Sequence, residues 1–392
     1  MTGFDLASRL THQISRCHGQ RSIGMNVKRF IIIGILSLVL LVIMVTQLST
    51  FGTNPHRQHK LETSTTIQPL IQQPVIVATK WPPLYFDPNN FYGDRRLLQY
   101  KSHFVPKEKR VTPLDFKFLI PGEKVCAGKG GPTLLVMVMS LPDNSAERQA
   151  IRDTWGCLAS GHPWPGGETI NGTMKVIFVF GNTGNKNHNK LLRSESIIKG
   201  DIVQSDFKES YVHLTYKVLM GYKWAQQYCP GTKFIMKVDE DTFFHVPFVF
   251  SLFEKQSWNN TIYGPFFKVD NVSRAKKFRV EPAAYAPPLY PPHVKGNLYF
   301  MPSELAFKIA KVAEYMPYVN IEDAYITGVL AKIFDARHVG IDKLVYHLRK
   351  PAKACDIASK KKMISQQITA SVFYLIWDRI RFKELCTNGP FI

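Results

Sequence analysis

The stretch KFIMKVDEDTFF, residues 233–244, contains both an apolar strand signal and a cluster of acids. The run 233–238 is short and mostly apolar, which is typical of a strand in a sheet that is buried on both faces. Successive side chains of an extended backbone point to opposite faces, so Asp239 and Asp241 point together while Glu240 points away. We therefore expect two carboxylates to converge where this strand ends.

Two further apolar runs precede this stretch, LLVMVMS at 134–140 and VIFVF at 176–180. Turn-forming residues bound both runs, as expected for buried strands. Asn144 and Glu147 have the spacing of a capping box for a helix through Trp155. A longer helix, ended by Cys229-Pro230-Gly231, is predicted from the apolar face made by Leu214, Val218, Tyr222 and Ala225. Strands alternating with helices predict an α/β domain with a largely parallel sheet and a ligand site at the strand carboxyl ends.

The acidic triplet Asp239-Glu240-Asp241 is the sharpest chemical signal in the chain. Two carboxylates on one face can hold Mn²⁺ or Mg²⁺ and leave coordination positions open for a diphosphate. A bound cation would neutralise charge on a departing phosphate group. A solvated turn is the alternative reading, but the buried strand before the triplet and Phe243-Phe244 after it favour the metal.

Arg148 and Arg152 are four residues apart on the first predicted helix and share one face. Paired guanidinium groups suit the recognition of a phosphate or nucleotide. The alternative is a surface helix on which Arg152 pairs with a nearby acid.

Glu322 and Asp323 follow Asn320, a candidate N-cap, and precede the apolar run AYITGVLAKIF at 324–334. The helix dipole keeps a carboxylate at this position ionised, which suits a general base that removes a proton from a hydroxyl. The alternative is structural, because acids favour the first turn of any helix. His347 is a candidate further metal ligand, against the alternative of an ordinary surface or core histidine.

The run Phe30–Leu48 carries no charge and spans roughly 28 Å as a helix, enough to cross a thin bilayer such as that of the Golgi. Basic residues flank its N-terminal side, which predicts a cytosolic tail at 1–29 and a signal-anchor helix at 30–48. A cleaved signal peptide is the alternative, but no small-x-small site precedes Phe51. Residues 49–128, rich in Thr, Gln and Pro, predict a luminal stem before a folded domain at 129–392.

Composition limits the partners that we expect. The formal net charge is +20, but lysines and arginines are scattered without the dense tract of nucleic-acid-binding arms, so we expect no nucleic-acid partner. Three N-x-S/T sequons, at Asn171, Asn259 and Asn271, follow the apolar run, as N-glycosylation in the lumen requires. Of the six cysteines, five follow that run, so one of the five either stays outside the intramolecular disulfides or pairs between chains.

Three stretches together carry a family resemblance: RQAIRDTWG at 148–156, the segment from Asp201 through DFKESYVHLTYK to the Asp239 triplet, and IEDAYITG at 321–328. In order and spacing, from about Leu134 to Cys386, the chain resembles the β1,3-galactosyltransferase and β1,3-N-acetylglucosaminyltransferase family, glycosyltransferase family 31. The resemblance implies a GT-A type, Rossmann-like catalytic domain, a UDP-sugar donor, Mn²⁺ dependence and inversion at the anomeric carbon. It also implies a Golgi type II membrane protein that acts on glycans of glycoproteins or glycolipids.

Site residues follow from the same resemblance. Asp323 would be the catalytic base beside Glu322, and Asp241 the most direct metal ligand, with Asp239 and His347 completing the metal site. The nucleotide would be bound with the help of Arg148, Arg152, Asp206, Lys217, Asp239 and Glu240.

The chain departs from the family after Tyr290-Pro291-Pro292, where it continues as HVKGN at 293–297. Many relatives have a cysteine there, so the departure leaves Cys229 without its usual partner and favours a disulfide between Cys355 and Cys386. This loop should contact sugar or acceptor, and the sequence leaves the donor open: galactose ahead of N-acetylglucosamine. A non-catalytic lectin-like or chaperone-like relative is the other alternative, which intact acids at both positions disfavour.

Overall fold

The computed structural model describes residues 81–87, 94–128, 130–255, 257–342, 346–347 and 350–386. The predicted cytosolic tail, the signal-anchor helix at 30–48 and residues 49–80 of the predicted stem lie outside the described residues. Among the helices of the described part, none has the length and apolar character to cross a membrane.

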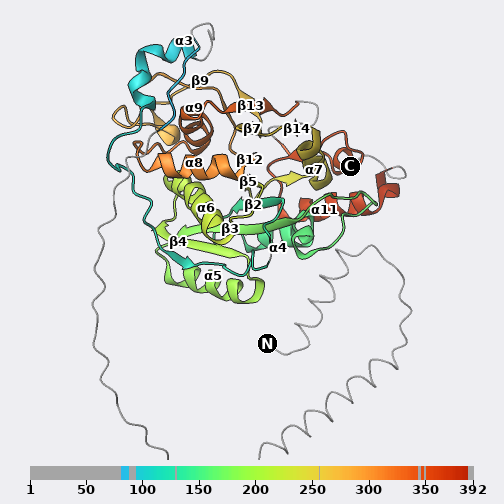
Figure 1. Ribbon diagram of the computed structural model, residues 1–392. Helices are drawn as coiled ribbons and strands as arrows, with labels where there is room; N and C mark the ends of the chain where they lie inside the picture. The colour runs from blue at the N-terminus through green and yellow to red at the C-terminus, as the bar shows by residue number, and fades with distance from the viewer. Residues whose placement is uncertain are drawn as a thin grey trace, which may run out of the picture. The chain divides into compact units, whose positions relative to one another are not determined.

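Within the described residues, the core is a mixed eight-stranded sheet in the order β1-β4-β3-β2-β5-β12-β7-β13 (Figure 1). The central strands run parallel, as predicted: β2 pairs with β3 and β5, and β3 pairs with β4. β12 runs antiparallel between β5 and β7, and the sequence analysis did not predict it. The strands are β1 Phe118–Ile120, β2 Leu134–Met139, β3 Met174–Asn182, β4 Ile202–Lys208, β5 Phe234–Asp239, β7 Thr261–Gly264, β12 Leu298–Pro302 and β13 Arg337–Gly340.

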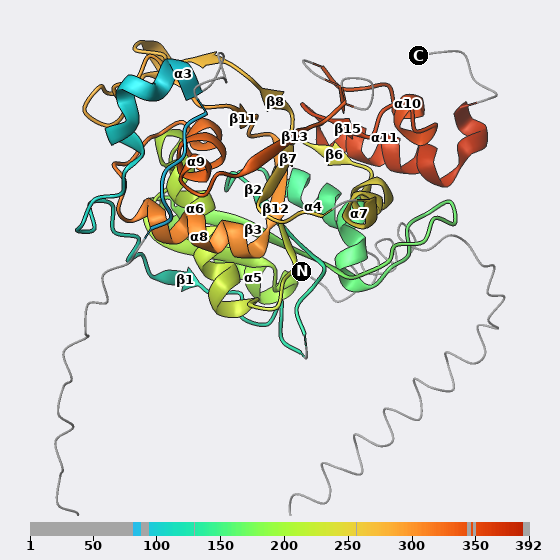
Figure 2. The ribbon, with the colours of Figure 1, turned by 45° about the horizontal axis from the view of Figure 1, so that its top comes forward.

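Helices cover both faces of the sheet because the strands are apolar on both faces. Alternate residues of β2 divide between two cores: Leu135 and Met137 pack on the side of α6 and α8, whereas Val136 and Val138 pack on the side of α4 and α11 (Figures 1 and 2). The helices are α3 Asp94–Leu97, α4 Ser145–Asp153, α5 Lys186–Lys199, α6 Leu214–Tyr228, α7 Val246–Lys255, α8 Ser303–Ala313, α9 Ala331–Ile333, α10 Ala354–Ala358 and α11 Ala370–Arg381. A π-helix, Ala324–Leu330, leads into α9.

In the part of the chain that the structure describes, short strands build three small sheets next to the main one. β9 (Asp270–Asn271) pairs with β10 (Leu289–Tyr290), and β8 (Phe266–Phe267) pairs with β11 (His293–Val294). β14 (Tyr346–His347), β15 (Ile364–Ser365) and β6 (Phe243–Phe244) form the third. β6 begins two residues after the acidic triplet, so this third sheet ties the triplet to the C-terminal part of the chain.

Two expectations about helix α4 are wrong in detail. The helix ends at Asp153 rather than at Trp155, which begins a separate 3₁₀ turn. Asn144 stands at the N-cap but its side chain makes no capping bond. Instead, its amide nitrogen donates to Glu240 Oε1, because the carboxylate from the end of β5 reaches this turn.

Part of the predicted stem packs on the domain. Trp81 contacts Tyr315 edge-to-face, Phe86 and Leu114 are buried in the core, and β1 joins the edge of the main sheet. The described residues between 81 and 386 belong to one compact unit by their internal contacts. The folded domain therefore includes chain well before residue 129.

Two disulfides lie in the described residues. Cys355 is bridged to Cys386, the pairing that the resemblance favoured. Cys229 does have a partner, Cys126, so the expectation that it lacked one is wrong. Beside this bridge the backbones at Gly131 and Gly231 approach closely. A Cβ on Gly131 would lie 2.0 Å from the carbonyl carbon of Gly231, so a larger residue would not fit. Cys157 is buried and belongs to neither bridge.

The two bridges should differ in their contribution to stability. The sequence separation is 103 residues for Cys126–Cys229 and 31 for Cys355–Cys386. Because a longer closed loop restricts the unfolded chain more, replacing the first pair by serine should lower the free energy of unfolding by about 1 kcal/mol more than replacing the second. Urea denaturation of the two double variants measures this difference, and a larger loss for the second pair would contradict it.

Candidate active site

Lys237 lies at the centre of a buried cluster of charges. Alternation along β5 places it on the same face as Asp239, and β12 places Tyr299 directly opposite it. Its ammonium nitrogen lies 2.6 Å from Asp239 Oδ1 and 3.7 Å from Glu322 Oε2, and it donates to the carbonyl of Gly296. Burial lowers the pKa of Lys237, but the charges of Asp239 and Glu322 outweigh burial and raise it, so the ammonium stays protonated.

Glu322 is almost fully buried beneath this cluster. Its Oε1 accepts a 2.5 Å hydrogen bond from the Tyr299 hydroxyl, to which the Tyr222 hydroxyl donates in turn at 3.3 Å. Burial raises the pKa of Glu322 to about 7, although the charge of Lys237 acts in the opposite direction. Glu322 is thus held by a fixed network that is closed to solvent.

Asp323 is partly exposed and has its carboxylate oriented by the backbone. Oδ2 accepts from the Gly296 N–H at 2.9 Å, and Oδ1 accepts from the Ala324 N–H at 2.8 Å. The helix that carries Asp323 begins at residue 322 and continues as the π-helix, so both acids lie in its first turn, as predicted. Asn320 caps nothing in the structure, since its amide nitrogen donates to the Arg279 carbonyl. Of the two acids, Asp323 is the one that a ligand can reach.

The side chains of the acidic triplet point in two directions. Glu240 is buried and accepts from the Ser140 hydroxyl, the Leu141 N–H and the Asn144 amide. Burial raises the pKa of Asp241, and the charge of nearby Asp239 raises it further. Two carboxylates that repel each other are a natural place for a cation, because a divalent ion relieves both the repulsion and the desolvation.

The donor set suits a hard divalent ion, and Asp239 and Asp241 are the residues that would hold it. Within the described chain, no three His, Cys, Asp or Glu side chains already form a metal-binding group. His347 lies in β14, whose partner Ser365 pairs in turn with Phe243, two residues after Asp241. The backbone therefore brings position 347 to the sheet that follows the triplet, while the His347 side chain lies outside the described part.

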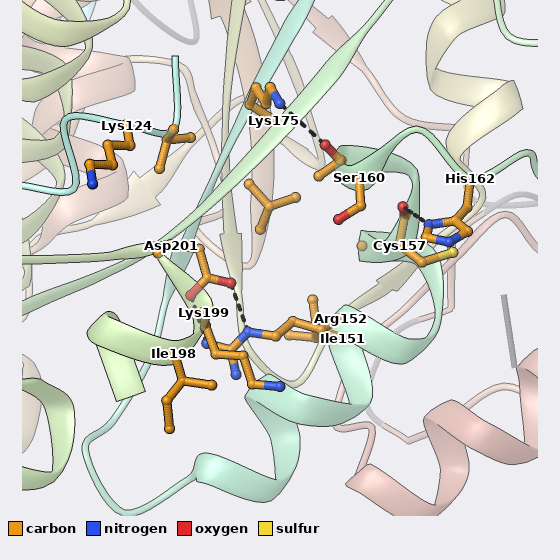
Figure 3. Close-up of a pocket in the computed structure, with 15 residues that line it drawn as sticks. Lys124, Ile151, Arg152, Cys157, Ser160, His162, Lys175, Ile198, Lys199 and Asp201 are labelled. Atoms are coloured by element: carbon orange, nitrogen blue, oxygen red, sulfur yellow. Dashed lines mark hydrogen bonds and ion pairs between the residues drawn. The ribbon is translucent and has the colours of Figure 1, made fainter. Parts of the chain in front are cut away.

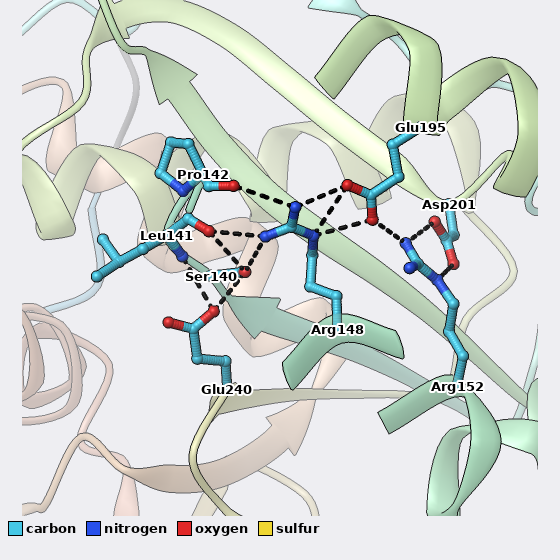
Figure 4. Close-up of polar contacts among 8 residues, drawn as sticks. All are labelled: Ser140, Leu141, Pro142, Arg148, Arg152, Glu195, Asp201 and Glu240. Carbon is cyan, nitrogen blue, oxygen red and sulfur yellow. Dashed lines mark hydrogen bonds and ion pairs between the residues drawn. The ribbon is translucent and has the colours of Figure 1, made fainter. Parts of the chain in front are cut away.

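Arg148 and Arg152 are engaged within the protein (Figure 4). Arg148 is 1% exposed and donates to Glu195, to the Ser140 hydroxyl and to two backbone carbonyls. Arg152 pairs with Glu195 at 2.7 Å and with Asp201 at 2.7 Å. The alternative in which Arg152 pairs with a nearby acid describes the structure, and Arg148 is paired as well. Nucleotide binding by these two arginines stays a prediction. The acids come from α5 and the residue before β4, elements that the sequence analysis did not predict.

Arg148 nevertheless supports the site from behind. The Ser140 hydroxyl that accepts from Arg148 donates to Glu240, so the arginine, the serine and the triplet form one chain of contacts (Figure 4). Lys217 adds a second brace, because it donates to the Ser140 carbonyl at 3.0 Å and pairs with Glu209 at 2.7 Å. The structure thus makes both side chains supports of the turn at 140–142.

Asp206 is not brought to the cluster. It is exposed on β4 and accepts from the Lys117 N–H at 2.9 Å, next to edge strand β1. A separate cavity of about 570 Å³ lies elsewhere, lined by Lys124, Arg152, Lys175 and Asp201 among others (Figure 3). Lys175 lies near the start of β3, and Asp201 precedes β4, so this cavity lies by the amino ends of the parallel strands. The acid cluster lies at the carboxyl end of β5, so the cavity is a different site.

Sequence reasoning missed Lys237 and Tyr299. Lys237 had a signal, because it interrupts an apolar strand two residues before Asp239 and must share its face. Tyr299 had none, since its place opposite Lys237 depends on a strand about sixty residues away. The three sequon asparagines, Asn171, Asn259 and Asn271, are all exposed.

Removing the central ammonium should be costly. Above the pKa of Glu322, which is about 7, Lys237→Met leaves the Asp239 and Glu322 carboxylates without their cation, so we expect a loss of about 3–5 kcal/mol in the free energy of unfolding there. Lys308→Met is the matched control, because Lys308 makes an exposed i,i+4 pair with Glu304, which contributes about 0.5 kcal/mol or less. Urea denaturation measures both, and equal losses would show that Lys237 is not buried between charges.

Stability should depend on pH through Glu322. The folded chain keeps a proton on Glu322 up to about pH 7, whereas an ordinary glutamate has a pKa of 4.5. The folded state then binds more protons, so the contribution of this group to the free energy of unfolding falls as pH rises from about 4.5 to 7. Glu322→Gln should remove this slope, which denaturation at several pH values detects. Parallel pH dependences of wild type and variant would contradict the assignment.

Comparison with known proteins gives the chain a family. Residues 146–342 match the family model described as Galactosyltransferase. The chain is 32% identical over 238 residues to beta-1,3-galactosyltransferase 5 of Pan paniscus, covering 60% of this chain and 76% of the relative. It is 28% identical over 218 residues to human UDP-GalNAc:beta-1,3-N-acetylgalactosaminyltransferase 1, covering 54% of this chain and 63% of the relative.

Among solved structures, the WbbM bifunctional glycosyltransferase in its apo form is similar with a TM-score of 0.34 at 11% identity, covering 66% of this chain and 52% of the other. The family match and the Pan paniscus relative carry the assignment. This chain belongs to the galactosyltransferase family and is a glycosyltransferase.

Proposed function

We propose that this chain is an inverting, metal-dependent β1,3-hexosyltransferase that moves a sugar from a UDP-sugar to a hydroxyl of a glycan. One observation carries the proposal: Lys237 joins Asp239, in the acidic triplet, to Glu322, beside Asp323. The buried Lys237 ammonium therefore connects the acidic triplet, which can hold a nucleotide diphosphate through a metal ion, to the acid pair, in which Asp323 can accept a proton. The names of the relatives support the β1,3 linkage and, in the N-acetylgalactosaminyltransferase, a UDP-sugar donor.

On the donor side, Asp239 and Asp241 would bind a divalent ion, with Mn²⁺ the ion that we propose and His347 a further ligand. When bound, such an ion supplies positive charge that stabilises the departing diphosphate. The chain itself keeps the carboxylates in place: Lys237 fixes Asp239, and the contacts of Glu240 with Ser140 and Leu141 fix the turn of the triplet.

On the acceptor side, Asp323 would act as general base. The acceptor oxygen forms a bond to the anomeric carbon as the bond from that carbon to the phosphate oxygen breaks, and UDP leaves with the electron pair. The acceptor proton passes to the Asp323 carboxylate, whose two oxygens are aimed by the N–H groups of Gly296 and Ala324. Glu322 stays in its hydrogen bond with Tyr299 and positions the turn that carries Asp323.

Galactose is our first choice of donor sugar, with N-acetylglucosamine as the alternative within the same family. We also propose that residues 30–48 anchor the chain in the Golgi membrane, with a cytosolic tail and the catalytic domain in the lumen. The exposed sequon asparagines and the two disulfides support a luminal location, because both modifications arise in the secretory pathway.

The proposal is tested with the purified full-length chain, Mn²⁺ and a panel of UDP-sugars, with β-linked Gal, GlcNAc or GalNAc as acceptors. UDP release that depends on both Mn²⁺ and acceptor is expected, and the donor that gives it identifies the transferred sugar. Absence of UDP release with every donor and acceptor pair would contradict the proposal.

Two substitutions should separate the donor and acceptor roles. Asp323→Asn should lower kcat by about 10²–10⁴-fold and leave the affinity for UDP intact, because only the proton acceptor is lost. Asp241→Asn should abolish Mn²⁺-dependent binding of UDP, measured by calorimetry. Asp378→Asn, an exposed acid on α11, is the matched control and should change neither quantity. Normal turnover by Asp323→Asn would show that another group is the base.

A further inference from the structure

The cavity of about 570 Å³ that includes Lys175 lies at the other end of the central strands from the acid cluster. Lys175 on β3 is paired in register with Leu135 of β2. Asp239, at the end of β5, is paired with Met139 of the same strand. From Leu135 to Met139 the strand advances about 13 Å. A ligand in this cavity would therefore leave the acid cluster free.

Cationic side chains outnumber acids around the cavity. Its lining contains Lys124, Arg152, Lys175 and Lys199 but one carboxylate, that of Asp201 (Figure 3). Both oxygens of Asp201 accept hydrogen bonds from Arg152, at 2.7 and 2.8 Å, so this acid is already neutralised. The three lysines therefore leave the cavity with an excess of positive charge.

Two of these lysines are partly buried without an acidic partner. Within the residues that the structure describes, neither Lys175 nor Lys199 forms an ion pair with a carboxylate, and the Lys175 ammonium makes a long contact of 3.4 Å with the Ala159 carbonyl. By contrast, the buried Lys217 and Lys237 each have a carboxylate partner. Because an ammonium that is partly removed from water needs a counter-charge, an anion in the cavity would supply what the protein does not.

The remaining walls suit the uncharged part of a small molecule. Ile151 and Val176 contribute buried apolar surface, and Val125 and Ile198 add apolar surface near the opening. The cavity volume falls in the range of about 300–1,000 Å³ that small-molecule sites occupy, and such sites combine apolar walls with a few polar groups. The cavity thus fits a molecule with one anionic group and an uncharged body.

We propose that this cavity is a second ligand site, separate from the active site, for the phosphate or sulfate ester of a small molecule such as a monosaccharide. The ammonium groups of Lys175 and Lys199 attract the tetrahedral oxyanion, and Ile151 and Val176 contact the body of the ligand. Binding needs no metal ion, because the lysines supply the positive charge. The inference goes beyond the proposed function, since it uses no residue of the acid cluster.

An acidic polymer spread over the surface is the competing occupant, because Lys124 is exposed and could meet such a chain. The small molecule fits better for two reasons. Lys175 and Lys199 are partly buried, so a flat polymer would reach them poorly, and the apolar walls would stay uncovered. The two occupants give different results in the same binding experiment.

The test measures binding to the full-length chain by calorimetry in buffer with EDTA. The probes are glucose 6-phosphate, inorganic phosphate, glucose and heparin. Glucose 6-phosphate should bind one site per chain on the order of tenfold more tightly than inorganic phosphate, because its body adds apolar contact. Glucose should show no binding. Asp241→Asn should leave the Kd for glucose 6-phosphate within twofold of wild type, which separates this site from the acidic triplet.

Lysine variants locate the site. Lys175→Met and Lys199→Met should each raise the Kd for glucose 6-phosphate on the order of tenfold, because each removes a charge-assisted contact. Lys199→Arg keeps the charge and should recover most of the affinity. Lys308→Met, which removes an exposed lysine on α8, is the matched control and should leave the Kd unchanged. Thermal unfolding without ligand confirms that each variant is folded.

Four results would overturn the inference. The first is no binding of glucose 6-phosphate by the folded wild-type chain. The second is binding that requires Mn²⁺ or Asp241, which would assign the ligand to the active site. The third is an equal effect of Lys308→Met and the two cavity variants, which would indicate attraction by net charge alone. The fourth is binding of heparin with none of the small anions, which would assign the lysines to a polymer. A chain that binds glucose 6-phosphate but transfers no sugar would refute only the proposed function.

Discussion

A lysine ammonium buried among carboxylates is the constraint on which the site depends. Lys237 reaches Asp239, Glu322 and the Gly296 carbonyl from the middle of a central strand. A buried charge without partners costs several kcal/mol, so breaking the contacts of this ammonium with Asp239 and Glu322 would destabilise the fold. The result is that an acid at the end of β5 and an acid in the first turn of a distant helix keep a fixed relation.

The fold makes that relation possible through one antiparallel strand. The parallel strands β2, β3, β4 and β5 end at one edge, where the acidic triplet emerges. β12 then returns beside β5 and brings Gly296 and Tyr299 to either side of Lys237 and Asp239. Gly296 meets Asp323 and Tyr299 meets Glu322, so the loop before β12 and the strand itself connect the triplet to the acid pair. A Cβ on Gly296 would lie 3.1 Å from Glu322 Oε2, so a larger residue there would require this acid to shift.

Much of this arrangement could be predicted from local sequence. The three parallel strands, the helix at 214–228 and the divergent directions of Asp239 and Glu240 follow from periodicity alone, because buried strands and alternating faces leave local signals. The partners of Arg148, Arg152 and Cys229 could not be predicted this way. Each partner is remote in sequence, and pairing across tens of residues leaves no local pattern. Arg148 and Arg152 illustrate this limit of sequence analysis. A pair of guanidinium groups can bind phosphate or carboxylate, and in the structure they bind the carboxylates of Glu195 and Asp201.

The central claim is that the diphosphate binds at the Asp239 side of the Lys237 cluster, whereas the general base, Asp323, lies on its Glu322 side. A crystal structure of the chain with UDP and Mn²⁺, with anomalous scattering to locate manganese, tests it most directly. We predict a manganese peak within bonding distance of a carboxylate oxygen of Asp241 or Asp239, the diphosphate on that ion, and an Asp323 carboxylate that the nucleotide leaves free. UDP in the cavity beside Lys175, with no manganese at the triplet, would contradict the account.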